Sequence, residues 1–222
     1  MTRQYFIGLF AEGNTDYRFL ESVVEKVFYD IAYRATGNFE FRVSILNPQT
    51  KGTGFTEKVL NVATYGYSQF SINVLCVHRD ADSSDRENVW KYSFSPAIEA
   101  IEKADEECCD EIIPVIPVHT IESWLFADKQ LFISYLSTEL TETDLEISGN
   151  PESFRNPKQK LQTAIRISQE GKAKKRRNLD IADFYMPLGS EVSLDRLKEL
   201  ESFSRFYSDV ERWFIKNRLI QD

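Results

Sequence analysis

Two short apolar runs, each followed at once by acidic residues, stand out in the pattern of hydrophobic and polar positions along this chain. Residues 5–11 (YFIGLFA) are almost continuously apolar, too few for a helix of their own, and they end at Glu12. Residues 71–77 (SINVLCV) form the second run, which ends in residues 78–82, HRDAD. The two runs predict strongly buried strands whose carboxyl ends carry acids.

The segments between and after these runs predict further strands and helices. Apolar residues from Phe19 to Ile31 recur on one helical face, so we expect a helix that ends near Arg34. Residues 39–46 alternate between apolar and polar, as in a strand with one wetter face. Helices are expected over residues 55–65 and 96–104, and a polar loop over residues 83–92.

Residues 112–118 (IIPVIPV) predict a fourth strand, at an edge of the sheet. Pro114 and Pro117 cannot donate hydrogen bonds to a ladder, and proline in a strand is confined to such positions. Strands that alternate with helices of this length imply crossover connections. The prediction is therefore an α/β fold with a mostly parallel four-stranded sheet flanked by helices.

The pattern changes after Asp128, where no further strong strand is predicted. Helices are expected over residues 129–136, 157–168, 194–200 and 203–218, and Asn156 is the expected cap of the second of these. We therefore divide the chain into an α/β domain, residues 1–128, and an α-helical C-terminal extension, residues 129–222, packed on it.

Composition and charge restrict the class of protein. The 222 residues are long enough for a substantial core. With a net charge of −8, contact with phosphates would need a local basic patch or bridging metal ions. Three cysteines without framework spacing indicate a reducing compartment. No signal peptide and no run of about 18 apolar residues is evident, so a soluble, cytoplasmic protein without membrane association is expected.

The acids at the strand ends suggest a metal site. Glu12 ends the first strand, Asp16 lies in the first turn of the next helix, and Asp80 and Asp82 face one side if their strand continues through them. Clustered carboxylates repel one another unless a proton or a cation intervenes, and oxygen ligands suit Mg²⁺ or Mn²⁺. The alternative is a solvated acidic loop, with Asp16 merely favouring the helix dipole. Because both acidic pairs end strong strands, we favour the metal site.

The motifs EGNTD (residues 12–16) and HRDAD (residues 78–82) resemble those of the Toprim domain of topoisomerases, primases and OLD-type nucleases. The first is most similar to the OLD-type nucleases. Residues 117–128 (PVHTIESWLFAD) are similar to a Toprim-like family of small bacterial proteins thought to act beside ATPase partners in phage defence. The resemblance covers the first 128 residues well and the remainder loosely. It implies Mg²⁺-dependent phosphodiester chemistry, with Glu12 as ligand or general acid/base, Asp80 and Asp82 as ligands, and Asp16 as the second acid.

Two parts of the OLD-type pattern are missing or ambiguous. The chain contains no G-x-x-x-x-G-K-[ST] motif, so any ATPase must be a separate chain. The late lysine near the scissile phosphate has several candidates, either Lys158 or a basic run. That run comprises Lys172, Lys174, Lys175, Arg176 and Arg177. It would either grip a nucleic-acid backbone or form a solvated loop, and no interleaved aromatic residues support stacking of single strands.

Three further side chains near the predicted strand ends have two interpretations each. Glu122 is either an additional metal ligand, as the resemblance suggests, or a glutamate that favours a helix N-terminus. His78 and His119 are either packed or capping residues, the interpretation that we favour, or proton carriers or metal ligands.

The sequence thus predicts a metal-dependent nuclease, using Mg²⁺ or Mn²⁺ to hydrolyse DNA or RNA and acting with a separate ATPase in phage defence. One alternative is a non-catalytic subunit that binds an ATPase partner. A second is a sugar-nucleotide transferase with a D-x-D motif, which leaves EGNTD unexplained. The oligomeric state stays open, a homodimer included.

Overall fold

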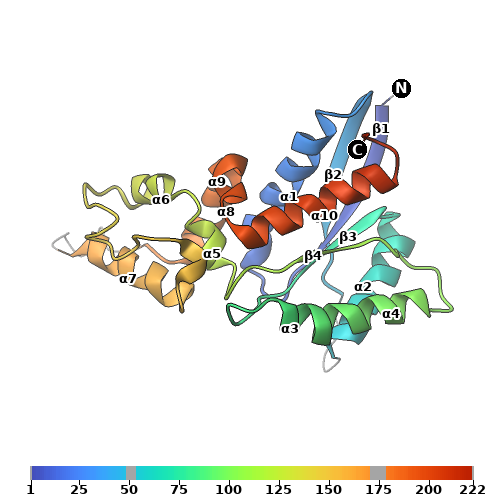
Figure 1. Cartoon of the computed structure of the whole chain (residues 1–222), viewed down its shortest axis with the longest axis horizontal. Helices are drawn as coiled ribbons and strands as arrows, with labels where there is room; N and C mark the ends of the chain where they lie inside the picture. The colour runs from blue at the N-terminus through green and yellow to red at the C-terminus, as the bar shows by residue number, and fades with distance from the viewer. Residues whose placement is uncertain (1, 49–53, 171–178, 222) are drawn as a thin grey trace.

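A four-stranded parallel sheet in the order β2-β1-β3-β4 forms the centre of the computed structural model (Figure 1). The structure describes residues 2–48, 54–170 and 179–221. Strand β1 (Thr2–Phe10) pairs with β2 (Asn38–Ile45) and β3 (Val74–His78), and β4 (Ile112–Val115) pairs with β3. Every one of these pairs is parallel, so the predicted α/β fold with a mostly parallel four-stranded sheet is confirmed.

The proline-containing strand lies at the sheet edge, as predicted. Its carbonyls at Glu111, Val115 and Pro117 accept hydrogen bonds from β3 and its continuation. Alternate residues of this segment turn their backbone groups toward β3, and Pro114 is one of those that face away from it. Its missing N–H is therefore on the free side of the strand. The proline therefore costs the ladder no hydrogen bond.

The order in which the strands are added to the sheet changes side between β1 and β3. The chain passes from β1 to β2 on one side, then crosses back to β3 on the other side of β1. Helix α1 (Asp16–Ala32) covers the face that contains Ile7 and Leu9, whereas α2 (Phe55–Phe70) covers the face that contains Leu75 and Val77. Such a reversal leaves a crevice at the carboxyl ends of the two strands, where ligands bind in open α/β sheets.

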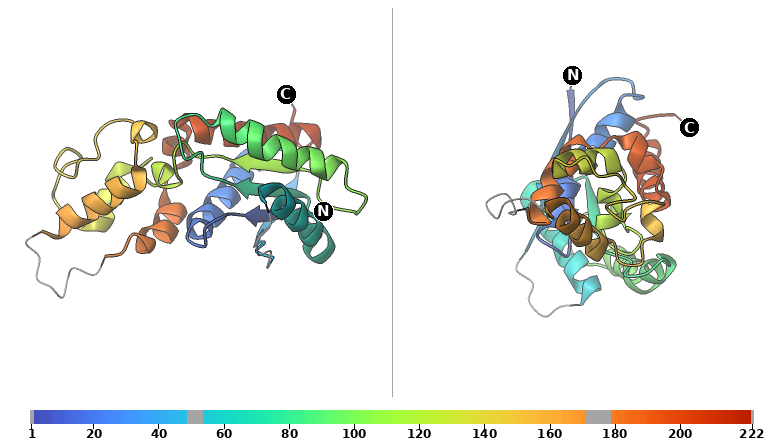
Figure 2. Two further views of the ribbon diagram at one scale, coloured as in Figure 1. Left: turned by 90° about the horizontal axis from the view of Figure 1, so that it is seen from below. Right: turned by 90° about the vertical axis from the view of Figure 1, so that its left-hand side faces the viewer.

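Helices cover both faces of the sheet (Figures 1 and 2). On the α1 face, α8 (Ala182–Glu191) packs on α1, and α10 (Glu201–Lys216) packs on both α1 and β4. On the opposite face, α2 packs against α4 (Ser95–Glu102). Helix α10 comes from the C-terminal part of the chain, yet it completes a layer of the α/β domain.

The rest of the C-terminal part is helical, as predicted. Its helices are α6 (Lys129–Leu136), α7 (Pro157–Gln169) and α9 (Leu194–Lys198), with the short 3₁₀ helix η2 (Pro151–Ser153). Figures 1 and 2 show α6 and α7 at one end of the molecule, away from the sheet. One buried cluster includes residues from before and after Asp128, such as Phe28 and Phe214, whose ring centroids lie 5.8 Å apart. A domain boundary at Asp128 stays a prediction.

Several elements differ from the sequence prediction. The expected loop over residues 83–92 is wrong in its second half, which contains α3 (Glu87–Val89) and the start of the π-helix η1 (Trp90–Phe94). Burial of Phe94 against the sheet stabilises this segment. The short helix α5 (Glu122–Leu125) and α8 were not predicted, and α2 extends beyond residue 65 to Phe70.

All three cysteines are free thiols, in agreement with the absence of a disulfide framework in the sequence. Among the described residues, no helix combines the length and the apolar character that crossing a membrane requires.

Candidate functional site

The crevice between the carboxyl ends of β1 and β3 brings together side chains that are far apart in the sequence. The two strands remain in register up to the pair Phe10–Val77. The segment that leads into α1 follows β1, and His78 ends β3. Glu122, at the start of α5, and Tyr185, on α8, approach from the same side of the sheet. The site therefore uses four separate segments of the chain.

Asp16 is the most deeply buried of the four acids in the two motifs. It is the first residue of α1, is 9% exposed, and its backbone N–H donates to the Gly13 carbonyl at 3.2 Å. A Cβ atom on Gly13 would lie 2.5 Å from Asp16 Oδ2, so the glycine makes room for this carboxylate. Burial raises the pKa of Asp16 against the opposing charge of His78, and the negative charges of Asp80 and Glu122 raise it further.

His78 lies between two carboxylates. Its Nε2 is 3.2 Å from Asp80 Oδ1, and its Nδ1 is 3.6 Å from Asp16 Oδ2. The second distance brings opposite charges together but is too long for a hydrogen bond, so Nδ1 has no hydrogen-bond partner among the described residues. Burial disfavours the charged imidazole, but the hydrogen bond and charge of Asp80 and the charge of Asp16 outweigh burial and raise the pKa of His78. The histidine is therefore packed, as favoured from the sequence, and also part of the acidic cluster.

Asp80 and Glu122 connect β3 to the C-terminal helices. Asp80 Oδ1 accepts a hydrogen bond from the backbone N–H of Ile121 at 2.9 Å. Glu122 is 3% exposed, and its Oε1 accepts a hydrogen bond from the hydroxyl of Tyr185 at 2.7 Å. Burial raises the pKa of Tyr185, and the charge of Glu122 raises it further, so the phenol stays protonated. Glu122 thus both begins a helix and belongs to the acidic cluster.

Tyr185 is a site residue that the sequence analysis missed. It lies on α8, whose interior proline argues against a helix when only the sequence is considered. No motif or spacing links it to Glu122, which lies 63 positions earlier in the chain. Only the packing of α8 on α1 reveals the contact.

Glu12 lies at the rim of the crevice. Its side chain is 43% exposed, and its Oε1 lies 3.5 Å from Arg79 Nη1. The Arg79 guanidinium also lies over the ring of Phe55, 4.6 Å from its centroid. The charge of Glu12 contributes to the raised pKa of His78, which places the carboxylate within electrostatic reach of the cluster.

Asp80 and Asp82 were predicted to face a common side if their strand continued through them, and this condition is not met. Strand β3 ends at His78, and Asp82 adopts the left-handed conformation with a φ of 54°. Its backbone N–H donates to the carbonyl of His119, which is also left-handed, at 2.8 Å. Alternation along a strand therefore does not apply to Asp82. Its side chain is exposed, whereas Asp80 contacts His78.

The predicted nucleic-acid-binding residues lie elsewhere or outside the described chain. Lys158 is exposed on the first turn of α7. The basic run of Lys172, Lys174, Lys175, Arg176 and Arg177 lies outside the described residues.

The donor atoms of the cluster suit a hard divalent cation, but their arrangement is not a ready-made ligand cage. Asp16, Asp80 and Glu122 supply carboxylate oxygens, the ligands that Mg²⁺ and Mn²⁺ prefer. Within residues 2–48, 54–170 and 179–221, however, no three His, Cys, Asp or Glu side chains are placed to hold one ion. Here His78 occupies the position between Asp16 and Asp80. Ion binding would require these carboxylates to turn away from the imidazole.

A family model described as a domain of unknown function, DUF4276, matches residues 11–211. Comparisons with curated proteins and with solved structures found no match. The matched region includes both acidic motifs and every helix from α1 to α9. The chain therefore belongs to the DUF4276 family.

Proposed function

We propose that this protein is a metal-dependent nuclease that hydrolyses phosphodiester bonds of DNA or RNA. The observation that supports the proposal is the convergence of His78, Asp80 and Glu122 around Asp16 at the crevice between β1 and β3. A buried carboxylate such as Asp16, whose pKa is raised by burial and by the charges of neighbouring carboxylates, is unfavourable in a purely structural role. Such carboxylates are common where a cation or a proton is part of the chemistry.

In this proposal Asp16, Asp80 and Glu122 are the candidate ligands, and Glu12, at the rim, is a ligand or general acid/base. A bound Mg²⁺ or Mn²⁺ would polarise a phosphoryl oxygen and activate water. Tyr185 holds the Glu122 carboxylate in place through its hydroxyl, and the N–H of Ile121 does the same for Asp80. Protonated His78 offsets part of the negative charge of Asp16 and Asp80.

The substrate and the partners follow from the same proposal. The chain is acidic, so the basic run at residues 172–177 is the candidate contact for a nucleic-acid backbone. An ATPase, if required, is a separate chain, because the sequence lacks a P-loop motif. The proposed role as an effector in bacterial phage defence rests on the resemblance of residues 117–128 to a Toprim-like family of small bacterial proteins.

Cleavage of labelled DNA and RNA with Mg²⁺ or Mn²⁺ tests the proposal. We expect Asp80→Asn and Glu12→Gln to lower the cleavage rate about 100-fold or more, as loss of preorganised charge at a reacting phosphate does. Asp105→Asn and Glu106→Gln remove the same charges from exposed positions and should cleave like the wild type. Undiminished cleavage by both site variants would falsify the assignment.

A second candidate is a non-catalytic subunit that binds an ATPase. The observation that favours it is the position of His78 between Asp16 and Asp80, together with the absence of a preformed ligand cage in the described part of the chain. This candidate predicts a stable complex with the ATPase and no cleavage by either the isolated chain or the assembled pair. Metal-dependent cleavage by the complex, lost in Asp80→Asn, would rule it out.

A further inference from the structure

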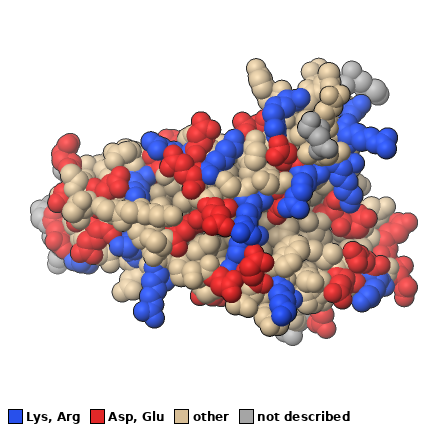
Figure 3. Space-filling model, in the orientation of Figure 1, with Lys and Arg blue, Asp and Glu red and all other residues tan. Residues whose placement is uncertain are grey.

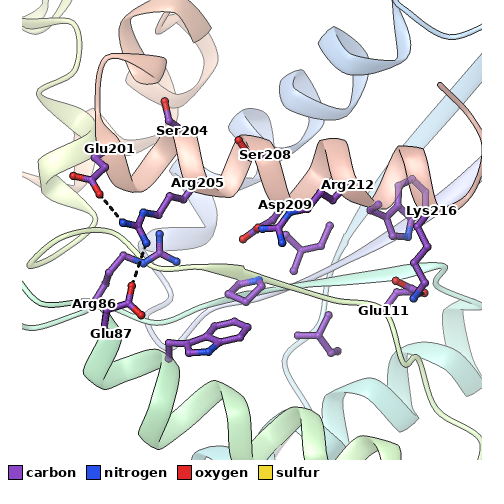
Figure 4. A pocket seen from close by; sticks show the side chains of 15 residues that line it. Arg86, Glu87, Glu111, Glu201, Ser204, Arg205, Ser208, Asp209, Arg212 and Lys216 are labelled. Atoms are coloured by element: carbon purple, nitrogen blue, oxygen red, sulfur yellow. Dashed lines mark hydrogen bonds and ion pairs between the residues drawn. The ribbon is translucent and has the colours of Figure 1, made fainter. Parts of the chain in front are cut away.

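A groove with a volume of ≈ 630 Å³ lies at the β4 edge of the sheet, apart from the acidic cluster (Figure 4). One wall is α10, the floor is the free edge of β4, and the other wall is formed by α3 and η1. Ligand pockets for small molecules commonly have volumes of about 300–1,000 Å³. The groove is therefore large enough for a metabolite-sized ligand.

Most charges in the groove are paired with each other. Arg205 Nη1 lies 3.1 Å from Glu87 Oε1, and its Nη2 lies 2.7 Å from Glu201 Oε1 (Figure 4). Farther along α10, Arg212 pairs with Asp209, and Lys216 pairs with Glu111. These ion pairs leave Arg86 as the remaining basic residue of the lining.

Arg86 lacks partners for two of its donors. Its Nε and Nη1 atoms are buried and have no hydrogen-bond partner among the described residues. Figure 4 shows Arg86 reaching from the start of α3 toward α10, with its guanidinium beside that of Arg205. Burial lowers the pKa of Arg86, and the like charge of Arg205 lowers it further. Two adjacent guanidinium groups, one of them unsatisfied, form a favourable position for an anion.

A second unsatisfied donor belongs to the same lining. Trp213 is 4% exposed, and its indole Nε1 has no hydrogen-bond partner within the described residues. Buried polar groups are normally hydrogen-bonded, so each exception needs an explanation. The buried atoms of the lining that lack a partner among the described residues are Arg86 Nε, Arg86 Nη1 and Trp213 Nε1. All three are donors, which indicates a ligand rich in acceptors.

The groove also offers an exposed aromatic surface. Trp90 lines it, is 40% exposed, and stacks on Phe94 with ring centroids 6.4 Å apart. An added peptide strand is disfavoured here, because Pro114 removes an N–H from the free edge of β4. An anion with a flat aromatic group therefore matches the lining better than an extended peptide.

We propose that this groove binds a nucleoside phosphate, whose phosphate accepts hydrogen bonds from Arg86 and Arg205 and whose base stacks on Trp90. Four basic and four acidic side chains line the groove, so its net charge is zero. Because Glu87 and Glu201 both pair with Arg205, the donors of Arg86 that lack a partner in the described part of the chain are the groups that remain for an anion. Figure 3 shows basic and acidic residues mixed over this face, without a continuous basic field. This distribution favours a small ligand over a long polyanion.

Isothermal titration of the full chain with AMP and with ATP, in EDTA, tests the proposal, because EDTA removes any contribution of metal at the acidic site. We expect saturable binding at one site and a change in tryptophan fluorescence. Arg86→Gln should weaken binding about tenfold or more, through loss of a charge-assisted hydrogen bond. Trp90→Leu should weaken it about fivefold or more, through loss of stacking.

The controls separate this groove from other sites. Arg166→Gln removes an exposed guanidinium from α7, and Asp80→Asn alters the acidic cluster; both should bind AMP like the wild type. Inorganic phosphate should bind more weakly than AMP, and circular dichroism should show that every variant is folded. The proposal is overturned by the absence of saturable nucleotide binding, by unchanged affinity in both Arg86→Gln and Trp90→Leu, or by equal affinities for phosphate and AMP.

Discussion

Replacement of Tyr185 by phenylalanine tests the buried contact that connects α8 to the acidic cluster. The change removes only the hydroxyl, which donates to Glu122 Oε1 at 2.7 Å. Tyr185 is 2% exposed and Glu122 is 3% exposed, so water cannot readily replace the lost donor. A hydrogen bond to a charged group contributes about 1.5–3 kcal/mol, and we expect the free energy of unfolding to fall by about that amount. The melting temperature should fall by roughly 3–12 °C.

The chain contains a matched control for this variant. Tyr135 donates its hydroxyl to Glu191 Oε1 at 2.5 Å, but this tyrosine–glutamate pair is exposed to solvent. Water can therefore replace the hydroxyl, and Tyr135→Phe should change stability by no more than about 0.5 kcal/mol. Urea denaturation of the two variants, analysed at a common m value, measures the difference. Equal losses in the two variants would show that Glu122 is not held by a buried hydrogen bond.

Three further predictions concern His78, the packing of α8 on α1, and Gly13. The pKa of His78 is raised above its usual 6.5 in the folded state, so its interactions stabilise the fold fully below about pH 6.5. This stabilisation is lost as the pH rises through the folded-state pKa. Urea titrations across this pH range should therefore show a smaller decline in the free energy of unfolding for His78→Gln than for the wild type. Gly189→Ala places a Cβ 2.6 Å from the carbonyl oxygen of Phe19, and the backbone cannot easily move away. We therefore expect the free energy of unfolding, measured by urea denaturation, to fall by about 1–3 kcal/mol. Gly54→Ala, whose Cβ meets nothing within 4 Å, should lower it much less. Gly13→Ala displaces the Asp16 carboxylate, the end of a side chain, rather than backbone. We therefore expect a clear fall in the cleavage rate but little change in the melting temperature.

Much of the fold could be predicted from the sequence, because local patterns carried the information. The apolar runs at residues 5–11 and 71–77 became the adjacent strands β1 and β3. Pro114 correctly assigned β4 to an edge, and Pro117 lies beyond the end of the strand. Asn156 caps α7 through a hydrogen bond from the backbone N–H of Gln159 at 3.4 Å. Each of these features depends on the backbone chemistry of a few neighbouring residues.

Helix α8 shows where local patterns were insufficient. Pro187 lies inside it, and proline removes a backbone donor and disfavours a helix interior. Packing against α1 outweighs this preference, since Phe184, Tyr185 and Leu188 are all buried there. Burial of apolar surface depends on which elements meet, and that cannot be deduced from propensity alone.

The acidic cluster, too, was determined partly by the sequence and partly by the tertiary structure. The sequence by itself determined that acids follow two buried strands, and parallel pairing of those strands brings Asp16 and Asp80 to one end of the sheet. Only the tertiary structure decided that His78 lies between them, that Tyr185 reaches Glu122, and that the left-handed turn at Asp82 removes this residue from the alternation. The physical reason is one of range: strand periodicity acts between neighbouring residues, whereas charge, burial and hydrogen bonding depend on distances that the packed chain alone sets.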